Sequence, residues 1–137
     1  MKDLSTNYLG LTLRNPLIVG SCGLTKTAES NRTLAEQGAG AIVLKSLFEE
    51  QIAADLSSNL ENYQADYPEA FEYIRNYTRS NALEEYLDLI ADTRKAIDIP
   101  VIASINCVSG KEWVSFAQSV EKAGASAIEL NISLLPS

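Results

Sequence analysis

Two stretches of this sequence share one pattern, and that repeat limits the folds open to the chain. "GAGAIVLKS" (Gly38–Ser46) resembles "GASAIELNIS" (Gly124–Ser133), and a proline with apolar residues precedes each, in "NPLIVGS" (Asn15–Ser21) and "IPVIASI" (Ile99–Ile105). The order proline, strand, helix, Gly-Ala, strand therefore occurs twice. Each copy predicts one βαβ unit, because short continuous apolar runs that alternate with helices are typical of a parallel sheet covered by helices.

The elements are predicted from the apolar pattern and from the Gly and Pro residues at its boundaries. Strands are expected over Leu17–Gly20, Ala41–Leu44, Val101–Ile105 and Ala127–Asn131. Helices are expected over about Thr27–Gln37, over Asn81–Ala96, and from a capping box at Ser109–Glu112 to Gly124. Ahead of these elements, residues 1–16 predict a small hairpin that turns at Gly10.

The stretch from Ser46 to Ser80 breaks this rhythm. It is long for a connection between a strand and a helix, which usually takes a few residues. It contains segments with helical apolar spacing, and Pro68 suits the first turn of one of them. Because ligands bind at the carboxyl ends of the strands in parallel α/β folds, this elaborated loop predicts either a lid or binding loop, or a packing or oligomer surface.

Composition excludes several classes of function. The 137 residues suit one domain, and their net charge of −7, with Lys and Arg scattered, argues against binding nucleic acid or an anionic membrane. No apolar run approaches the roughly 20 residues that cross a bilayer, and no apolar signal segment is seen, so we expect a cytoplasmic protein with Cys22 and Cys107 as free thiols. The absence of histidine excludes Ser-His-Asp and Cys-His catalysis and His-ligated metal, and no metal site is predicted.

Small or polar residues stand at the carboxyl ends of all four predicted strands. They are Ser21, Cys22, Gly23, Lys45, Asn106, Cys107 and Asn131. Because the carboxyl ends of parallel strands meet at one edge of the sheet, we expect these residues to converge on one binding site. The small residues after the first strand would let backbone amides approach a flat ligand.

Lys45 and Asn131 occupy equivalent positions in the two repeats. Lys45 could hold an anionic ligand or act as a base, or it could form a structural ion pair with Glu129, which shares a strand face with Asn131. Asn131 could donate and accept hydrogen bonds at the edge of a heterocycle, or it could cap the loop that follows. The residues alone leave both choices open.

Taken in order, "NPLIVGSCGLT", "GAGAIVLKS", "IPVIASIN" and "GASAIELNIS" resemble the amino-terminal half of dihydroorotate dehydrogenases and their close relatives. The resemblance implies an FMN-binding (β/α)8 barrel, of which residues 1–137 supply about the first four βα units. It implies oxidation of dihydroorotate or a related dihydropyrimidine, with hydride transfer to FMN, in pyrimidine biosynthesis. By motif match, the flavin contacts would be Gly20, Ser21, Lys45, Ser46, Asn106 and Asn131, and Lys45 and Asn131 would also contact the substrate.

The sequence departs from that family in three ways. Leu134 stands where the family has a Cys or Ser base, and its side chain cannot take a proton; Ser133 and Cys107 are weaker candidates for that role. The Asn-rich substrate-binding segment expected after Lys45 is absent. A full barrel takes about 250 residues, so we expect the 137-residue chain to be inactive on its own.

Three functions therefore remain open. The first is the FMN-dependent oxidoreductase with a small-molecule substrate. The second is a non-catalytic half barrel that binds a ligand, forms a homo-oligomer or pairs with a complementing half-barrel chain, since the edge strands of a half barrel would be exposed. The third, a Schiff base formed by Lys45, rests on that single residue.

Overall fold

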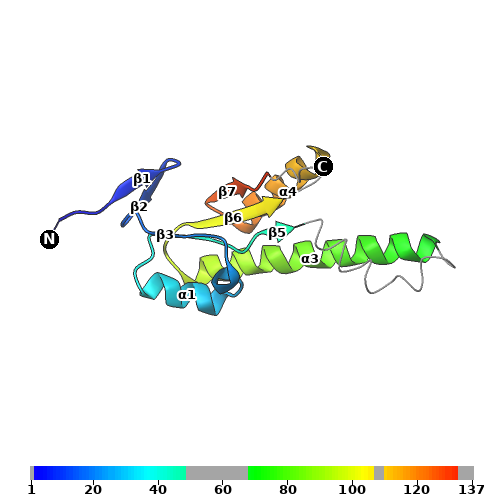
Figure 1. The fold of residues 1–137 in the computed structure, drawn as a ribbon, viewed down its shortest axis with the longest axis horizontal. Helices are drawn as coiled ribbons and strands as arrows, with labels where there is room; N and C mark the ends of the chain where they lie inside the picture. Colours follow the sequence, from blue (N-terminus) through cyan, green and yellow to red (C-terminus); the bar gives the residue numbers. More distant parts are fainter. Residues whose placement is uncertain (1, 49–67, 107–109, 133–137) are drawn as a thin grey trace, which may run out of the picture.

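The computed structural model describes residues 2–48, 68–106 and 110–132. It begins with an antiparallel hairpin of β1 (Thr6–Tyr8) and β2 (Leu11–Leu13), drawn at the blue end of Figure 1. Leu9 and Gly10 both have positive φ, 55° and 77°, which is the type I′ turn that suits the twist of a two-residue hairpin. The predicted hairpin with its turn at Gly10 is confirmed.

A parallel sheet forms the centre of the protein. Its strands are β3 (Ile18–Val19), β4 (Ala41–Val43), β5 (Leu47–Phe48), β6 (Val101–Asn106) and β7 (Ala127–Leu130). β3 pairs with β4, β4 with β6, and β6 with β7, all in parallel. All four predicted strands are present. Their neighbours follow the order of the chain, as in a (β/α)8 barrel, whereas the order reverses in a doubly wound sheet.

The helices of the described residues are η1 (Gly23–Thr25), α1 (Ala28–Glu36), α3 (Pro68–Ala96) and α4 (Gly110–Ala123). The Thr27 side chain accepts a hydrogen bond from the Ser30 backbone N–H and caps α1, and Gly38 follows the helix with φ 108°. The helix expected from Asn81 begins earlier, at Pro68, because no proline or glycine interrupts the chain between the two positions. Part of the predicted loop is therefore helical, and residues 49–67 of it lie outside the described residues.

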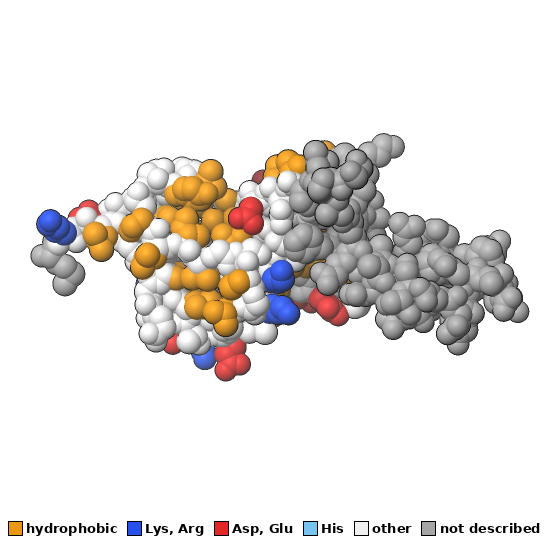
Figure 2. All heavy atoms as spheres, in the orientation of Figure 1, with side chains coloured by type: hydrophobic (Ala, Val, Ile, Leu, Met, Phe, Trp, Pro, Cys, Tyr) orange, Lys and Arg blue, Asp and Glu red, His pale blue; other side chains and the backbone are white. Residues whose placement is uncertain are grey.

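The α-helices of the described residues pack on one face of the sheet. On that face a continuous apolar core joins the sheet to the three α-helices, through Ala35 of α1, Tyr86 and Ile90 of α3, Val120 of α4, and Ile42, Val101, Ala103 and Ile105 of the strands. On the other face Leu13 of the hairpin packs on Ala41, Val43 and Ile102. Figure 1 shows α1 and α3 along the same side of the strands, and Figure 2 shows hydrophobic side chains gathered beside the hairpin. One helix-covered face and one inner face are the arrangement of a barrel wall, so the predicted partial (β/α)8 barrel is confirmed.

β4 and β5 pair with the same edge of β6 but are separated by a bulge. The last pair of β4 joins Val43 to Ile102, and the first pair of β5 joins Leu47 to Ile105. One more residue therefore lies between the two pairs in this segment (44–46) than in β6. Bulges of this kind re-aim side chains beside functional sites, and this one contains two predicted site residues.

Candidate functional site

An open cavity of about 440 Å³ lies at the carboxyl edge of the sheet. It is lined by Ser21, Lys45, Ser46, Glu129, Leu130 and Asn131. The volume is in the range of small-molecule sites. Four residues predicted to bind a ligand, from three different strand ends, thus come together in one cavity.

Three other predicted residues within the described part of the chain, Gly20, Cys22 and Asn106, are not among those that line this cavity. Gly20 precedes Ser21 and is exposed, and a Cβ built on it meets no atom within 4 Å, so open space lies beside it. Asn106 ends β6 and is half-buried. Cys22 is a half-buried free thiol in the described region. The remaining candidates, Cys107, Ser133 and Leu134, lie outside the described residues.

A chain of serine hydroxyls runs from the cavity wall to a carboxylate. The Ser46 backbone N–H donates to Ser21 Oγ at 2.8 Å, and the Oγ atoms of these two residues lie 3.0 Å apart. Ser46 Oγ lies 2.6 Å from Ser104 Oγ, and Ser104 Oγ donates to Glu129 Oε1 at 2.6 Å. Short O–H···O⁻ distances of this size are typical of charge-assisted hydrogen bonds. The chain runs from the segment after β3, through the bulge between β4 and β5, to β6 and β7.

The register of the sheet explains why these groups meet. Ser104 of β6 and Glu129 of β7 are direct register partners. Ser104 is fully buried and follows Ile102 on the inner face, because side chains alternate along a strand. The bulge brings Ser46 to the opposite flank of Ser104. The two neighbours of β6 thus each supply one partner for the same buried hydroxyl.

Tyr86 of α3 fills the gap that the bulge leaves in the hydrogen-bond ladder. The backbone carbonyl of Ile102 accepts from Leu44 of the neighbouring strand, so the backbone groups of Ser104 face the same edge of β6. There the Tyr86 hydroxyl donates to the Ser104 carbonyl at 3.0 Å and accepts from the Ser104 N–H at 2.9 Å. One phenol therefore replaces a missing strand residue.

Burial raises the pKa of Tyr86 to about 12; the hydrogen bond with the Ser104 backbone acts to lower it, and the Glu129 charge raises it further. The neutral phenol is therefore kept over the physiological pH range, and both of its hydrogen bonds persist there.

Two backbone hydrogen bonds hold the cavity edges in place. The Asn131 N–H donates to the Ile105 carbonyl at 2.8 Å and extends the pairing of β7 with β6 by one residue. The Lys45 N–H donates to the carbonyl of buried Thr25 at 3.3 Å and ties the bulge to η1. Lys45 and Asn131 are therefore positioned by the backbone on opposite strands of the site.

Three residues in or behind this site were not predicted from the sequence, and a fourth was predicted only as an ion-pair partner. Ser104 and Leu130 were read only as strand residues, and Tyr86 only as part of the apolar face of a helix. Glu129 was considered as an ion-pair partner for Lys45; both side chains line the cavity, and that pair stays a prediction. A polar residue inside the apolar run "VIASIN" was the signal available for Ser104.

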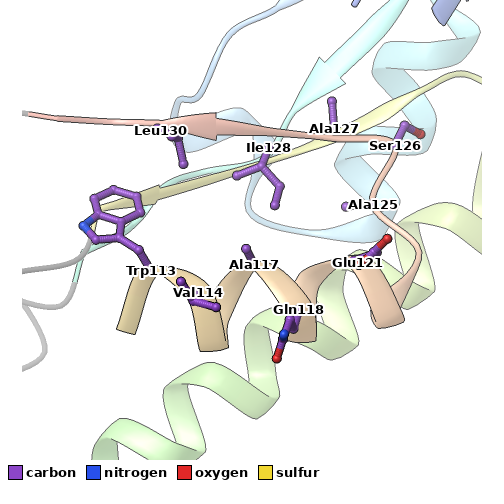
Figure 3. A pocket seen from close by; sticks show the side chains of 10 residues that line it. All are labelled: Trp113, Val114, Ala117, Gln118, Glu121, Ala125, Ser126, Ala127, Ile128 and Leu130. Carbon is purple, nitrogen blue, oxygen red and sulfur yellow. The ribbon is translucent and has the colours of Figure 1, made fainter. Parts of the chain in front are cut away.

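A second, larger groove of about 580 Å³ runs between β7 and α4. In Figure 3, Trp113, Val114 and Ala117 of α4 lie across from Ile128 and Leu130 of β7. Val114 and Leu130 are 61% and 56% exposed. This groove is mainly apolar, whereas the first cavity joins an ammonium, a carboxylate, an amide and two hydroxyls, so the first is the candidate for chemistry.

Two further properties of the described residues concern membranes and metal ions. None of their helices combines the length and apolarity that a bilayer span requires. They also contain no cluster of three or more His, Cys, Asp or Glu side chains able to hold a metal ion, a finding confined to this part of the chain.

Comparison with known proteins identifies relatives along nearly the whole chain. No protein-family model matches it. It is 33% identical to an Aeropyrum pernix protein that bears the provisional name dihydroorotate dehydrogenase A (fumarate), over 96% of this chain and 41% of the relative. It is 30% identical to the catalytic subunit of dihydroorotate dehydrogenase B (NAD(+)) of Thermoplasma volcanium, over 97% and 42%, and to that of Methanocella arvoryzae, over 95% and 40%.

A solved structure supports the fold. The IMP dehydrogenase/GMP reductase-like protein of Corynebacterium glutamicum superposes with a TM-score of 0.52 at 15% identity, over 97% of this chain and 36% of that one. The chain spans about two fifths of the length of the curated relatives it matches. It is a distant homologue of the amino-terminal two fifths of dihydroorotate dehydrogenases, as the resemblance predicted.

Proposed function

We propose that the chain is the amino-terminal part of an FMN-dependent oxidoreductase that oxidises dihydroorotate or a related dihydropyrimidine. One observation carries the proposal: Ser21, Lys45, Ser46 and Asn131, the positions that match the flavin-contact motifs, line one cavity at the carboxyl edge of the sheet. The homology to dihydroorotate dehydrogenases supports the same conclusion. A cytoplasmic location and a small-molecule substrate belong to this proposal.

The residues present fit the ring part of FMN. A flavin ring carries both hydrogen-bond donors and acceptors on its edge, and the cavity offers an ammonium at Lys45, an amide at Asn131 and hydroxyls at Ser21 and Ser46. Open space beside Gly20 leaves the backbone there accessible to a flat ligand. In barrels of this type the phosphate is held by loops after the seventh and eighth strands, which are not among the four βα units of this chain.

When bound, FMN would supply the hydride acceptor. Lys45 would place a positive charge against the ring and favour any negative charge that develops there. Asn131, held by its backbone bond to Ile105, would orient a ring through its amide. Tyr86 and Glu129 would keep the serines in place from behind, through the contacts described above. These groups bind and orient a ligand.

Titration of the 137-residue chain with FMN tests the proposal, with absorbance and flavin fluorescence as readouts. We expect a perturbed flavin spectrum, and Lys45→Met should weaken binding roughly tenfold, about 1.4 kcal/mol. Lys122→Met is the matched control, because Lys122 is exposed in the last turn of α4. A spectrum that stays unchanged at high FMN, or equal binding by the Lys45 variant, would contradict the proposal.

A second candidate function is a non-catalytic half barrel that pairs with another polypeptide. The apolar β7–α4 groove favours it, since large apolar grooves at a sheet edge mark sites where protein packs. Sedimentation of the chain with and without Val114→Glu separates the two cases. A self-associated chain that this substitution dissociates supports pairing, and a monomer in both cases contradicts self-pairing.

A further inference from the structure

The serine chain has only one consistent direction. An ionised carboxylate accepts hydrogen bonds and donates none, so Ser104 donates its single hydroxyl proton to Glu129. Ser104 then has no proton for Ser46, and the 2.6 Å contact between them requires Ser46 to donate. By the same step Ser21 donates to Ser46 across 3.0 Å. All three hydroxyl protons therefore point toward Glu129.

This direction decides what the cavity wall offers to a ligand. Ser21 Oγ accepts one hydrogen bond, from the Ser46 backbone N–H, and Ser46 Oγ accepts one, from Ser21. Each oxygen keeps one lone pair, and neither keeps a proton. Both residues line the cavity, whereas Ser104 is fully buried behind them. Two serines that could in general donate or accept are thus reduced to acceptors.

We propose that Glu129 sets the hydrogen-bond polarity of the site through Ser104, so that Ser21 and Ser46 select a heterocycle whose facing edge carries N–H donors. Glu129 and Ser104 are positioning residues, since they act through the two serines. Because it names the ligand class of the cavity described above, the inference rests on the proposal that this cavity binds a small heterocycle. It does not depend on which oxidation, if any, follows.

The side chain and the backbone of Ser104 have separate hydrogen-bond partners. The Tyr86 hydroxyl forms hydrogen bonds with both backbone groups of Ser104. The Ser104 side chain therefore takes part only in the chain of hydroxyl groups. Ser104→Ala therefore removes the hydrogen bond to Glu129, while the hydrogen bonds between the Tyr86 hydroxyl and the backbone of residue 104 remain. The Ser46 hydroxyl would then be free to donate into the cavity, and the selection for N–H donors should be lost.

The first test locates the protons directly, by neutron diffraction from crystals of the deuterated chain. We expect deuterons on Ser21 toward Ser46, on Ser46 toward Ser104, and on Ser104 toward Glu129. A deuteron found in the reverse direction in either serine–serine contact would overturn the inference. This arm needs no ligand, so it is independent of the proposed function.

The second test measures selection with uracil, whose ring edge alternates N–H and C=O groups, against 1,3-dimethyluracil, which lacks the N–H groups. Binding is followed by NMR at the Ser21 and Ser46 amides. We expect uracil to bind about tenfold more tightly, as one or two hydrogen bonds allow. Ser104→Ala should bring the ratio close to one, and Glu129→Gln should lower it, because an amide can also donate to Ser104.

Glu121→Gln is the control, with the same loss of charge at an exposed residue of the other groove; it should leave the ratio unchanged. Equal binding of the two probes by the unmodified chain, or an unchanged ratio in Ser104→Ala, would overturn the inference. If FMN binds but neither probe does, the ligand class is wrong and the proposed function stands. If FMN and both probes all fail to bind, both are wrong.

Discussion

The helix-covered face of the sheet and the carboxyl end of its inner face are made by the same strands but are held by different kinds of contact. On the helix-covered face, apolar side chains such as Ile90 and Val120 pack into one continuous core. On the inner face, Ser46, Ser104 and Glu129 depend on one another through single hydrogen bonds. In apolar packing, the stability lost on substitution grows with the side-chain volume removed. In the hydrogen-bonded chain, removal of one residue also changes the hydrogen bonds of the others. One sheet thus combines a helix-covered face that is held by apolar packing with a polar inner edge where we propose that a ligand is selected.

The helix-covered face should give the largest stability loss. Ile90 is fully buried between α3 and the sheet, so Ile90→Ala should lower the free energy of unfolding by about 3 kcal/mol through lost burial and a residual cavity. Urea denaturation measures this change. Leu24→Ala, at a 63% exposed position, is the control, and a loss of similar size there would erase the distinction.

Loss of the Tyr86 hydroxyl, which reaches from α3 to the backbone of β6, should give an intermediate loss of stability. Tyr86→Phe keeps the buried ring but leaves the Ser104 N–H and carbonyl without their partner. We expect a loss of about 2 kcal/mol, the cost of stranding buried backbone groups. Tyr77→Phe, at a 66% exposed position of α3, should change stability little. If Tyr86→Phe and Tyr77→Phe unfold at the same urea concentration, the hydrogen bonds of the Tyr86 hydroxyl to the Ser104 backbone do not contribute to stability.

The same residue predicts a dependence on alkaline pH. Tyr86 titrates near 10.0 when unfolded and at about 12 when folded, because burial disfavours the phenolate. Between these values the unfolded state has lost a proton that the folded state keeps, so stability falls as pH rises, by at most about 1.4 kcal/mol per pH unit. Below pH 10 this contribution is fully present.

Urea titrations from about pH 9 to about pH 12 would show the slope, and Tyr86→Phe should remove the part due to this residue. Parallel pH profiles of the two proteins would contradict the assignment.

The β7–α4 groove should give the smallest effect on stability. Val114 is 61% exposed, so Val114→Ser should change the free energy of unfolding by less than about 0.5 kcal/mol. This groove lies on the helix-covered side of the sheet, but Val114, which lines it, is exposed. A loss near that of Ile90→Ala would show that the groove is part of the core.

Much of the fold could be predicted from the sequence, and the reason is periodicity. Apolar runs bounded by Gly and Pro mark the strands, and the repeat marks their parallel order, so Ser21, Lys45, Ser46 and Asn131 could be placed at one edge. Pro68 was indicated as a helix start, but the sequence did not show that the segment from Pro68 and the helix expected from Asn81 form one continuous helix, because no residue between them gives a local stop signal. Tyr86 and Ser104 could not be paired, since their contact depends on a register shift between distant strands.

The bulge at residues 44–46 also changes the phase of the strand. Before it, odd-numbered Val43 points to the inner face; after it, odd-numbered Leu47 packs with the helix-side core. A strand read with strict two-residue alternation would place these two side chains on the same face. Loss of one residue from the segment would therefore remove the bulge and restore strict alternation, with Leu47 still on the helix side but only two residues where Leu44, Lys45 and Ser46 now stand. The spacing between Val43 and Leu47 thus carries structural information that the identities of the intervening residues do not.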